Sequence, residues 1–294
     1  MNENILKLSF CKPNKKINKL NRQKITSSLL KFLVSVSAVI TIFFVLSIVG
    51  YILVKGIPQL RLSLFSFTYN SNNVSLFPAL VNTILITFIS LLISIPIGIG
   101  SAIYLIEYAK KDNKLVKIIR VTTETLSGIP SIVYGLFGLL FFVTYTKLGM
   151  SLLSGALTLS IMVLPLIMRT TEEALISVPQ SYREGSFGLG AGKLRTIFKI
   201  VLPSAIPGIL SGVILAIGRI VGESAALIYT AGTVPQIPEN ILGSGRTLSV
   251  HMYVLSNEGL YINQSYGTCV VLLLTVFGIN VISSIIAKKI SKGF

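Results

Sequence analysis

Two oppositely charged residues lie inside one of the most apolar parts of this sequence. Arg219 and Glu223 belong to the stretch AIGRIVGESAALIYTAG, residues 216–232. Residues four apart share one face of a continuous helix. An arginine at membrane depth costs at least about 2.5–3.5 kcal/mol, so we expect it to face protein or a wet pathway. Two interpretations follow: an ion pair that holds helices together, or an arginine that binds an anion and is oriented by the glutamate.

A glycine-rich stretch, GLGAGK at residues 188–193, has the composition of a phosphate-binding loop. An ATPase loop needs a glycine at its start and a Ser or Thr directly after the lysine, because that hydroxyl binds magnesium. Here Phe187 stands at the first glycine position and Leu194 follows Lys193. A dinucleotide site needs a preceding strand, and no strand pattern is present. The glycines therefore serve a purpose other than nucleotide binding.

A third stretch that can carry chemistry is LSGIPSIVYGLFG, residues 126–138. Gly128 and Pro130 favour a break in a helix, and Pro130 suits the first turn of a new half-helix. Free N–H groups at that start, together with the hydroxyl of Ser131, would receive an anion. The alternative is a packing kink between small residues, which is the more common use of such a pattern.

The elements that must position these residues are membrane helices. The chain has 294 residues, of which 52% are hydrophobic and 12% charged, too apolar a composition for a soluble domain. Uncharged runs recur that hold about 20 residues each, enough to cross a bilayer. We predict an all-α, polytopic membrane domain over residues 29–294. Its six expected spans are residues 30–54, 78–107, 122–146, 149–168, 204–230 and 264–287.

The net charge of +16 is distributed unevenly along the chain. Most lysines and arginines lie before the first span, between the second and third, between the fourth and fifth, and after the sixth. The positive-inside rule then places both termini in the cytoplasm, with residues 1–28 as a basic arm and residues 169–203 as a cytoplasmic loop. The charge therefore reports topology, which excludes nucleic acid as a partner. The single histidine, His251, is expected at the surface of an external connection and offers no metal site.

The cytoplasmic loop is expected to contain a short amphipathic helix. Ser181 and Glu184 have the spacing of a capping box, which predicts a helix start at Ser181. The residues expected on its apolar face are Phe187, Leu194, Ile197 and Phe198, and those expected in water are Arg183, Lys193 and Arg195. From this pattern alone, a helix lying on anionic lipid and a helix docking on a protein are equally supported.

The same loop has particular residues at fixed spacings. The loop contains a triplet that begins with glutamate, then three residues, a glycine, nine residues and Ile-x-Leu-Pro. These positions are held by Glu184, Gly185, Ser186, Gly190, Ile200, Leu202 and Pro203. The segment resembles the coupling motif of ABC importer permeases, which implies that it docks on a separate ATPase subunit. Gly185 and Ser186 replace the alanines of that motif, and the glycine costs about 1 kcal/mol of helix propensity.

A wider likeness, over residues 77–229, is to permease subunits of the PstA type from bacterial phosphate importers. The resemblance implies a bacterial inner-membrane location and three kinds of partner: a homologous second permease, two ATP-binding cassette subunits and an extracytoplasmic phosphate-binding protein. It makes Arg219 and Glu223 the expected translocation pair, with Ser131 on the same route. The chain is then a non-catalytic subunit without a cofactor, and its partners hydrolyse ATP.

Three other functions compete with this interpretation. Charge alone does not separate phosphate from other oxyanions, so a permease for molybdate or sulfate is the nearest alternative. An ion-coupled secondary carrier would use Glu223 as a proton site, although it has no need of an ATPase-docking segment. An intramembrane enzyme is the least supported, because no metal motif and no nucleophile with a base is present.

Overall fold

The computed structural model describes residues 15–71, 73–110, 113–259 and 261–292. Within these residues every regular element is a helix. The chain divides into two compact units, residues 1–52 and 53–294. The expected all-α architecture is confirmed.

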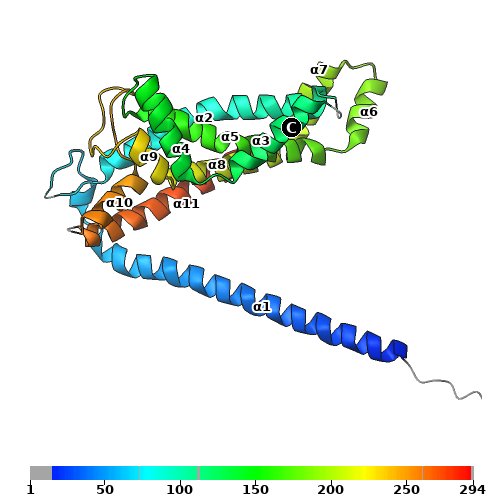
Figure 1. Ribbon diagram of the computed structural model, residues 1–294, viewed down its shortest axis with the longest axis horizontal. Coiled ribbons are helices and arrows are strands. Elements are labelled where there is room, and N and C mark those ends of the chain that lie inside the picture. The colour runs from blue at the N-terminus through cyan, green and yellow to red at the C-terminus, as the bar shows by residue number, and fades with distance from the viewer. Residues whose placement is uncertain (1–14, 72, 111–112, 260, 293–294) are drawn as a thin grey trace, which may run out of the picture. The chain divides into compact units, whose positions relative to one another are not determined.

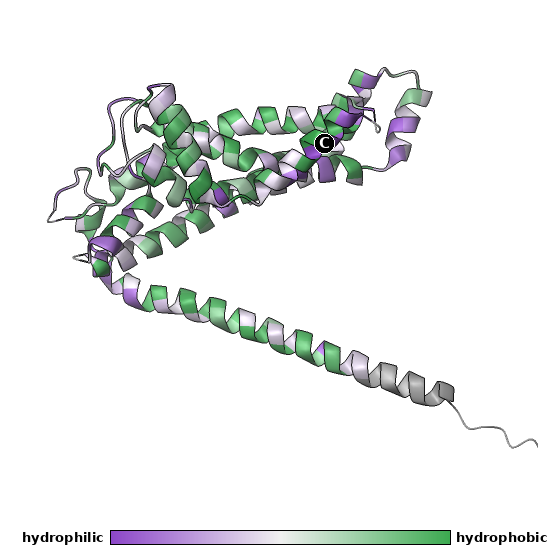
Figure 2. Ribbon diagram, in the orientation of Figure 1, coloured by the Kyte–Doolittle hydropathy of each residue, from purple (hydrophilic) through white to green (hydrophobic). Residues whose placement is uncertain are grey.

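The first unit consists mainly of α1 (Lys15–Gly56). From Leu29 to Val54 most of its large apolar side chains are exposed, and Figure 2 shows hydrophobic residues over most of the part whose side chains are described. Exposed apolar surface of this length suits hydrocarbon rather than water. The first half of the predicted basic arm, residues 1–14, lies outside the described residues.

The second unit is a helical bundle with short helices at both ends (Figure 1). Its helices are α2 (Phe77–Ile103), α3 (Lys114–Ser127), α4 (Ser131–Gly138), α5 (Leu152–Ser177), α6 (Gln180–Gly188), α7 (Lys193–Thr196), α8 (Leu202–Val221), α9 (Ala225–Thr230), α10 (Leu248–Glu258) and α11 (Ile262–Lys292). Three π-helical turns extend α2, α4 and the start of α8: η3 (Tyr104–Tyr108), η4 (Leu139–Tyr145) and η5 (Ile197–Val201). Two 3₁₀ turns, η1 (Ile57–Gln59) and η2 (Leu62–Phe65), precede α2.

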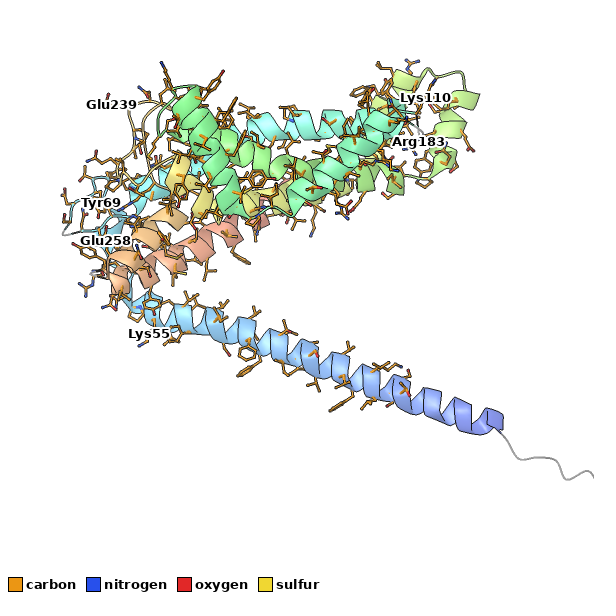
Figure 3. The ribbon with its side chains drawn as sticks, in the orientation of Figure 1. Lys55, Tyr69, Lys110, Arg183, Glu239 and Glu258 are labelled. Atoms are coloured by element: carbon orange, nitrogen blue, oxygen red, sulfur yellow. The ribbon has the colours of Figure 1, made fainter. Side chains whose placement is uncertain are left out.

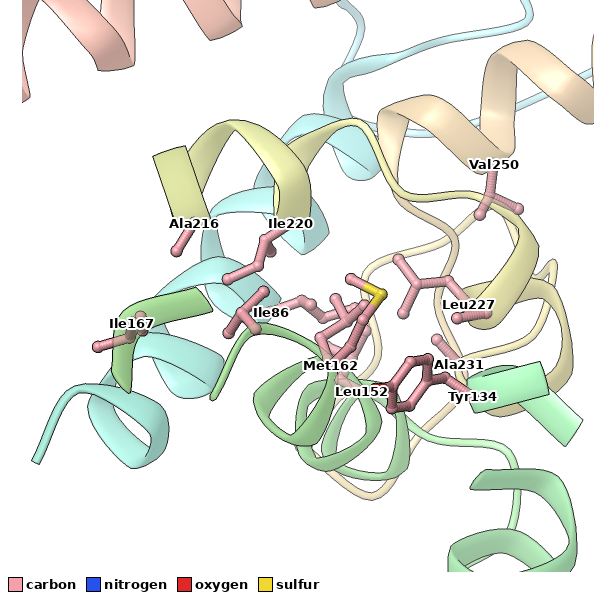
Figure 4. Packing of buried hydrophobic residues seen from close by; sticks show 13 residues of the cluster. Ile86, Tyr134, Leu152, Met162, Ile167, Ala216, Ile220, Leu227, Ala231 and Val250 are labelled. Carbon is pink, nitrogen blue, oxygen red and sulfur yellow. The ribbon is translucent and has the colours of Figure 1, made fainter. Parts of the chain in front are cut away.

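Helix α5 forms the centre of the bundle, where it packs against α2 and α8. Its buried residues meet those of α4, α8 and α9 in one apolar cluster, which includes Met162, Tyr134 and Ile220 (Figure 4). Hydroxyls also join the helices: Ser90 of α2 donates to the Ala156 carbonyl at 3.1 Å, and Ser160 of α5 donates to the Ser90 carbonyl at 3.1 Å. Small residues with such bonds allow the close helix packing that membrane bundles use.

Within the described residues, five helices are long and apolar enough to cross a membrane, and up to six spans result if a bent pair counts as one. The bent pair consists of α3 and of α4 with its extension η4. The chain bends by 105° between these two halves. The stretch predicted as a single span over residues 204–230 is interrupted, because α8 ends at Val221 and α9 begins at Ala225. Both predicted substrate-contacting stretches thus lie at breaks in helices.

Candidate functional site

The first break separates α3 from α4. Pro130 precedes α4 in an extended conformation, so Ser131 is the first residue of the new helix. The Tyr134 hydroxyl donates to the Leu126 carbonyl at 2.8 Å and so ties the second helix to the end of the first. Ser131 therefore lies in the first turn of a half-helix, where backbone N–H groups have no partner within the helix.

The start of α4 lies against α9 because a glycine permits it. A Cβ atom placed on Gly135 would come within 2.8 Å of the Ala226 Cα, closer than side chains tolerate. Only a glycine at this position lets the two backbones approach this closely. The close contact brings the α3–α4 break and the α8–α9 break into one region of the bundle.

The second break separates Arg219 from Glu223. Gly222 ends α8, so the helix that would place the two residues on one face stops between them. A Glu223 carboxylate oxygen instead accepts the backbone N–H of Ala226 at 3.1 Å, at the start of α9. The Glu223 carbonyl accepts the Ser249 hydroxyl at 2.5 Å. In the part of the chain that the structure describes, no ion pair joins Arg219 to Glu223, so the sequence-based expectation of a helical pair does not hold in this conformation.

Arg219 lies in the last turn of α8 and is half-buried. The negative end of the helix dipole stabilises a cation at that place. Its guanidinium is close enough to Tyr134 of α4 to act on the phenol electrostatically. Among the described contacts, no hydrogen bond or ion pair engages the guanidinium. Its donors therefore remain available for an anion. No described hydrogen bond joins Ser131 to either charged residue.

A second arginine, Arg246, is buried in the connection that leads to α10. Its guanidinium stacks over the Tyr69 ring, 4.8 Å from the centroid, and two of its nitrogens, Nε and Nη2, have no hydrogen-bond partner among the described residues. His251 of α10 lies edge-on to the same ring and is fully buried, so the expectation of a surface histidine is wrong. Burial and the charge of Arg246 lower the pKa of His251 to about 3; a weaker contact with the Val74 backbone acts in the opposite direction. The histidine is therefore neutral, and the arginine carries the charge of this cluster.

The predicted amphipathic helix is two helices. Pro179 precedes α6, so the helix begins at Gln180 and the predicted capping box at Ser181 is wrong. A turn at Leu189 and Gly190 ends α6, and the chain continues through α7 into the π-helical turn before α8. Gly190 has a φ of +79°, a conformation that favours glycine. The Ser186 and Thr196 hydroxyls, 2.8 Å apart and buried, hold the two helices together.

The outer surface of this segment carries large apolar side chains, and Lys193 and Arg195 are exposed there as expected. Its exposed large side chains are Tyr182, Phe187, Leu189, Leu194 and Phe198. Leu189, at the tip, is 91% exposed, whereas Ile197 faces the bundle and is buried. A Cβ on Gly185 would meet nothing within 4 Å, and Glu184 is exposed beside it. The segment therefore exposes large apolar side chains among charged ones, which are Glu184, Lys193, Arg195 and Lys199. No side chain covers its glycines.

The end of the motif belongs to the bundle rather than to this outer surface. Ile200 lies in the π-helical turn η5, and Leu202 and Pro203 form the first turn of α8. All three are partly buried, and Leu202 packs against a second apolar cluster formed by α2, α5 and α8. The motif thus begins on the exposed segment and ends inside a membrane helix.

Arg183 was expected in water and is buried. Figure 3 shows it at the base of α6, beside the segment that carries Lys110. It pairs with Glu107 of η3 at 2.7 Å. The sequence contains no signal for this pair, because its members lie far apart along the chain and fit no local spacing rule.

Comparisons with known proteins agree on one family. Residues 94–294 match the family described as binding-protein-dependent transport system inner membrane component. The probable ABC transporter permease protein YqgI of Bacillus subtilis is 36% identical over 299 residues, which cover 92% of this chain and 99% of the relative. The phosphate transport system permease protein PstA 1 of Mycobacterium tuberculosis is 33% identical over 211 residues, or 71% of this chain and 69% of the relative.

A solved structure shares the fold. It is a bacterial ABC transporter involved in the import of the acidic polysaccharide alginate, and one of its chains has a TM-score of 0.63 to this chain at 15% identity. The match covers 91% of this chain and 99% of the other. At that identity the likeness concerns the fold alone.

Proposed function

The chain belongs to the family of binding-protein-dependent transport system inner membrane components, and we propose that it is the permease subunit of an ATP-driven importer of inorganic phosphate. The family makes it an ABC importer permease and a multi-pass membrane protein. ABC permeases work with ATP-binding cassette subunits and a binding protein.

The observation that carries the proposal is the unengaged guanidinium of Arg219. It lies within a membrane-crossing helix, at a break, and no carboxylate neutralises it among the described residues. A guanidinium presents five N–H donors in a plane, which suits the oxygens of phosphate. Phosphate would arrive beside the first turn of α4, where Ser131 and free N–H groups supply further donors. Glu223 would orient the start of α9 through Ala226.

The apolar segment formed by α6 and α7 is the proposed contact with the ATPase subunit. A helix with large exposed apolar side chains at its tip is the kind that docks into a groove. In this proposal Glu184, Gly185, Ser186 and Gly190 belong to the docking region. Ile200, Leu202 and Pro203 carry its movement into α8. ATP is then hydrolysed by the partner subunits.

The proposed assembly has two different permeases, two ATP-binding cassette subunits and an extracytoplasmic phosphate-binding protein in a bacterial plasma membrane. The basic segments between the spans support a topology with both termini and α6 in the cytoplasm. In that topology the connection from Tyr229 to Ser265 would lie outside the cell and help receive the binding protein. The named phosphate permeases among the relatives support this arrangement.

Reconstitution of the complex in liposomes tests the cargo. We expect Arg219→Gln to lower the initial rate of radiolabelled phosphate uptake at least about tenfold, since loss of a charged hydrogen-bonding partner costs roughly 1.5–3 kcal/mol. The matched control is Arg169→Gln, which removes an exposed arginine already paired with Glu173. Equal phosphate uptake by the Arg219→Gln and Arg169→Gln variants would show that Arg219 does not bind the cargo.

Competition separates phosphate from the other candidate cargoes. An excess of unlabelled molybdate or sulfate is expected to leave phosphate uptake unchanged. Inhibition by either anion, with ATP hydrolysis stimulated by that anion through its binding protein, would assign the permease to that oxyanion. Uptake that continues without ATP and follows a proton gradient would favour a secondary carrier.

A further inference from the structure

We propose that Arg183 and Glu107 form a clamp that carries the movement of α6 to the end of α2, so that both α2 and α8 follow the ATPase subunit. This inference rests on the proposed coupling role of the segment. Along the chain, α6 is connected directly only to α5 and to α7, which leads into α8. The clamp adds a connection to a helix that no spacing rule indicates.

The Arg183 guanidinium of α6 binds two other elements at once. Its Nε and Nη2 donate to the same Glu107 oxygen, at 3.0 and 2.7 Å. Its Nη1 donates to the Val178 carbonyl at 3.0 Å, and Nη2 also donates to the Leu175 carbonyl at 3.0 Å. Both carbonyls belong to the end of α5, where a helix has no partner of its own for them. One side chain of α6 is therefore bonded to α5 and to η3.

Burial makes these bonds stiff. The side chains of Arg183 and Glu107 are only 11% and 9% exposed, so solvent does not screen the pair. The planar fork of an arginine holds several acceptors in a fixed geometry. A second contact runs in parallel: the Lys193 ammonium of α7 lies 4.8 Å from the centroid of the Tyr108 ring, which belongs to the same π-helical turn as Glu107.

The position of the clamp joins the docking surface to the core of the bundle. Tyr182 and Glu184, on either side of Arg183, are exposed on the outer surface of α6. On the other side, η3 continues directly from α2, which packs along α5. A displacement of α6 therefore reaches α2 through Glu107 without passing through α8. This path makes Arg183 and Glu107 positioning residues for transport.

The test compares transport with ATP hydrolysis in reconstituted complexes. Glu107→Gln keeps a hydrogen-bond acceptor for the guanidinium and removes the charge. We expect the phosphate moved per ATP hydrolysed to fall about fivefold or more, in the range of typical coupling energies, while the ATPase subunit still binds. Arg183→Lys, which keeps the charge and loses the fork, is expected to give an intermediate ratio. Glu173→Gln breaks the exposed Arg169 pair and is the matched control.

A reporter independent of the cargo completes the test. A fluorophore on a cysteine at Lys110, an exposed residue that follows η3, is expected to change its emission when vanadate traps the closed ATPase. That change should be lost in Glu107→Gln although nucleotide is still trapped. A retained change, or reduced assembly with an unaltered ratio of phosphate to ATP, would overturn the clamp. A wild-type complex that shows the change but moves no phosphate would contradict the proposed cargo alone.

Discussion

Two arginines of this chain, Arg183 and Arg219, differ in whether they form an ion pair. A glutamate lies close to Arg219 in sequence, whereas the glutamate that binds Arg183 is distant in sequence. Arg183 binds Glu107, 76 positions earlier in the chain, and both side chains are buried. Arg219 has Glu223 only four positions later, yet no described ion pair joins them. A spacing of four brings side chains together only where the helix continues, and α8 ends between these two. Proximity in sequence is therefore a weaker guide to an ion pair than helix continuity.

The two environments suit two tasks. The Arg183 guanidinium makes four hydrogen bonds, so a charge that would be costly to bury is compensated and the surrounding elements are held together. The Arg219 guanidinium is half-buried and carries no described bond. An anionic ligand stabilises such a partly buried cation strongly, because the ligand provides the hydrogen-bond acceptors and the opposite charge that the protein does not provide. A structural arginine and a proposed transport arginine are thus distinguished by their partners.

The largest expected difference between the two arginines is in stability. Arg183→Met leaves the Glu107 carboxylate buried without a partner and removes two bonds to α5, so we expect the free energy of unfolding to fall by about 3–5 kcal/mol. Arg219→Gln is expected to change it by less than about 1 kcal/mol, because no protein bond is lost. Thermal unfolding of the purified chain in lipid nanodiscs measures both. Equal decreases in the free energy of unfolding of the two variants would show that Arg219 is as important for stability as Arg183.

A smaller effect is expected at Arg246, which has no carboxylate partner among the described residues and lies in the same buried cluster as His251. The pKa of His251 is about 3 in the folded chain and about 6.5 in an unfolded one. Above that upper value the histidine is neutral in both states, and stability is at its full value. As the pH falls below it, only the unfolded state binds the proton, so stability decreases by about 1.4 kcal/mol per pH unit.

Unfolding midpoints between about pH 7.5 and about pH 5 check this dependence; the carboxylates titrate mainly below that range. His251→Gln removes the titrating group, so its midpoint should vary less over the same range. A variant that loses stability with acid as steeply as the wild type would show that other groups are responsible.

The smallest expected effect concerns Glu223. Its carboxylate accepts the Ala226 N–H, so Glu223→Ala should cost about 1 kcal/mol, the usual value of a lost helix cap. Glu223→Gln keeps an acceptor and should cost less. If Arg219 needed Glu223 as a buried partner, both substitutions would instead destabilise the chain as strongly as Arg183→Met. Chemical unfolding of the three variants side by side decides between these outcomes.

The predictable features were those that depend on local sequence. Long uncharged runs predicted an all-α membrane protein, and Pro130 with Gly128 predicted the break after which Ser131 begins a helix. The break at Gly222 was missed, because apolar residues continue on both sides and no proline marks it. The capping box predicted at Ser181 is wrong, since the N-cap is Pro179, two residues earlier, and the helix begins at Gln180. Which residues bind cargo or the ATPase remains a prediction.

The sequence by itself determined the helices, their apolar faces, the family motif from Glu184 to Pro203 and the presence of an arginine at membrane depth. Only the tertiary structure decided which charges are paired. Glu107, in the turn that follows α2, and Arg183 of α6 meet because both lie at the same end of the bundle. Their proximity depends on how the intervening helices pack. The approach of α4 to α9 at Gly135 is decided in the same way. Hydrophobic periodicity is a local property of the chain, whereas a buried ion pair requires two distant segments to share one low-dielectric site.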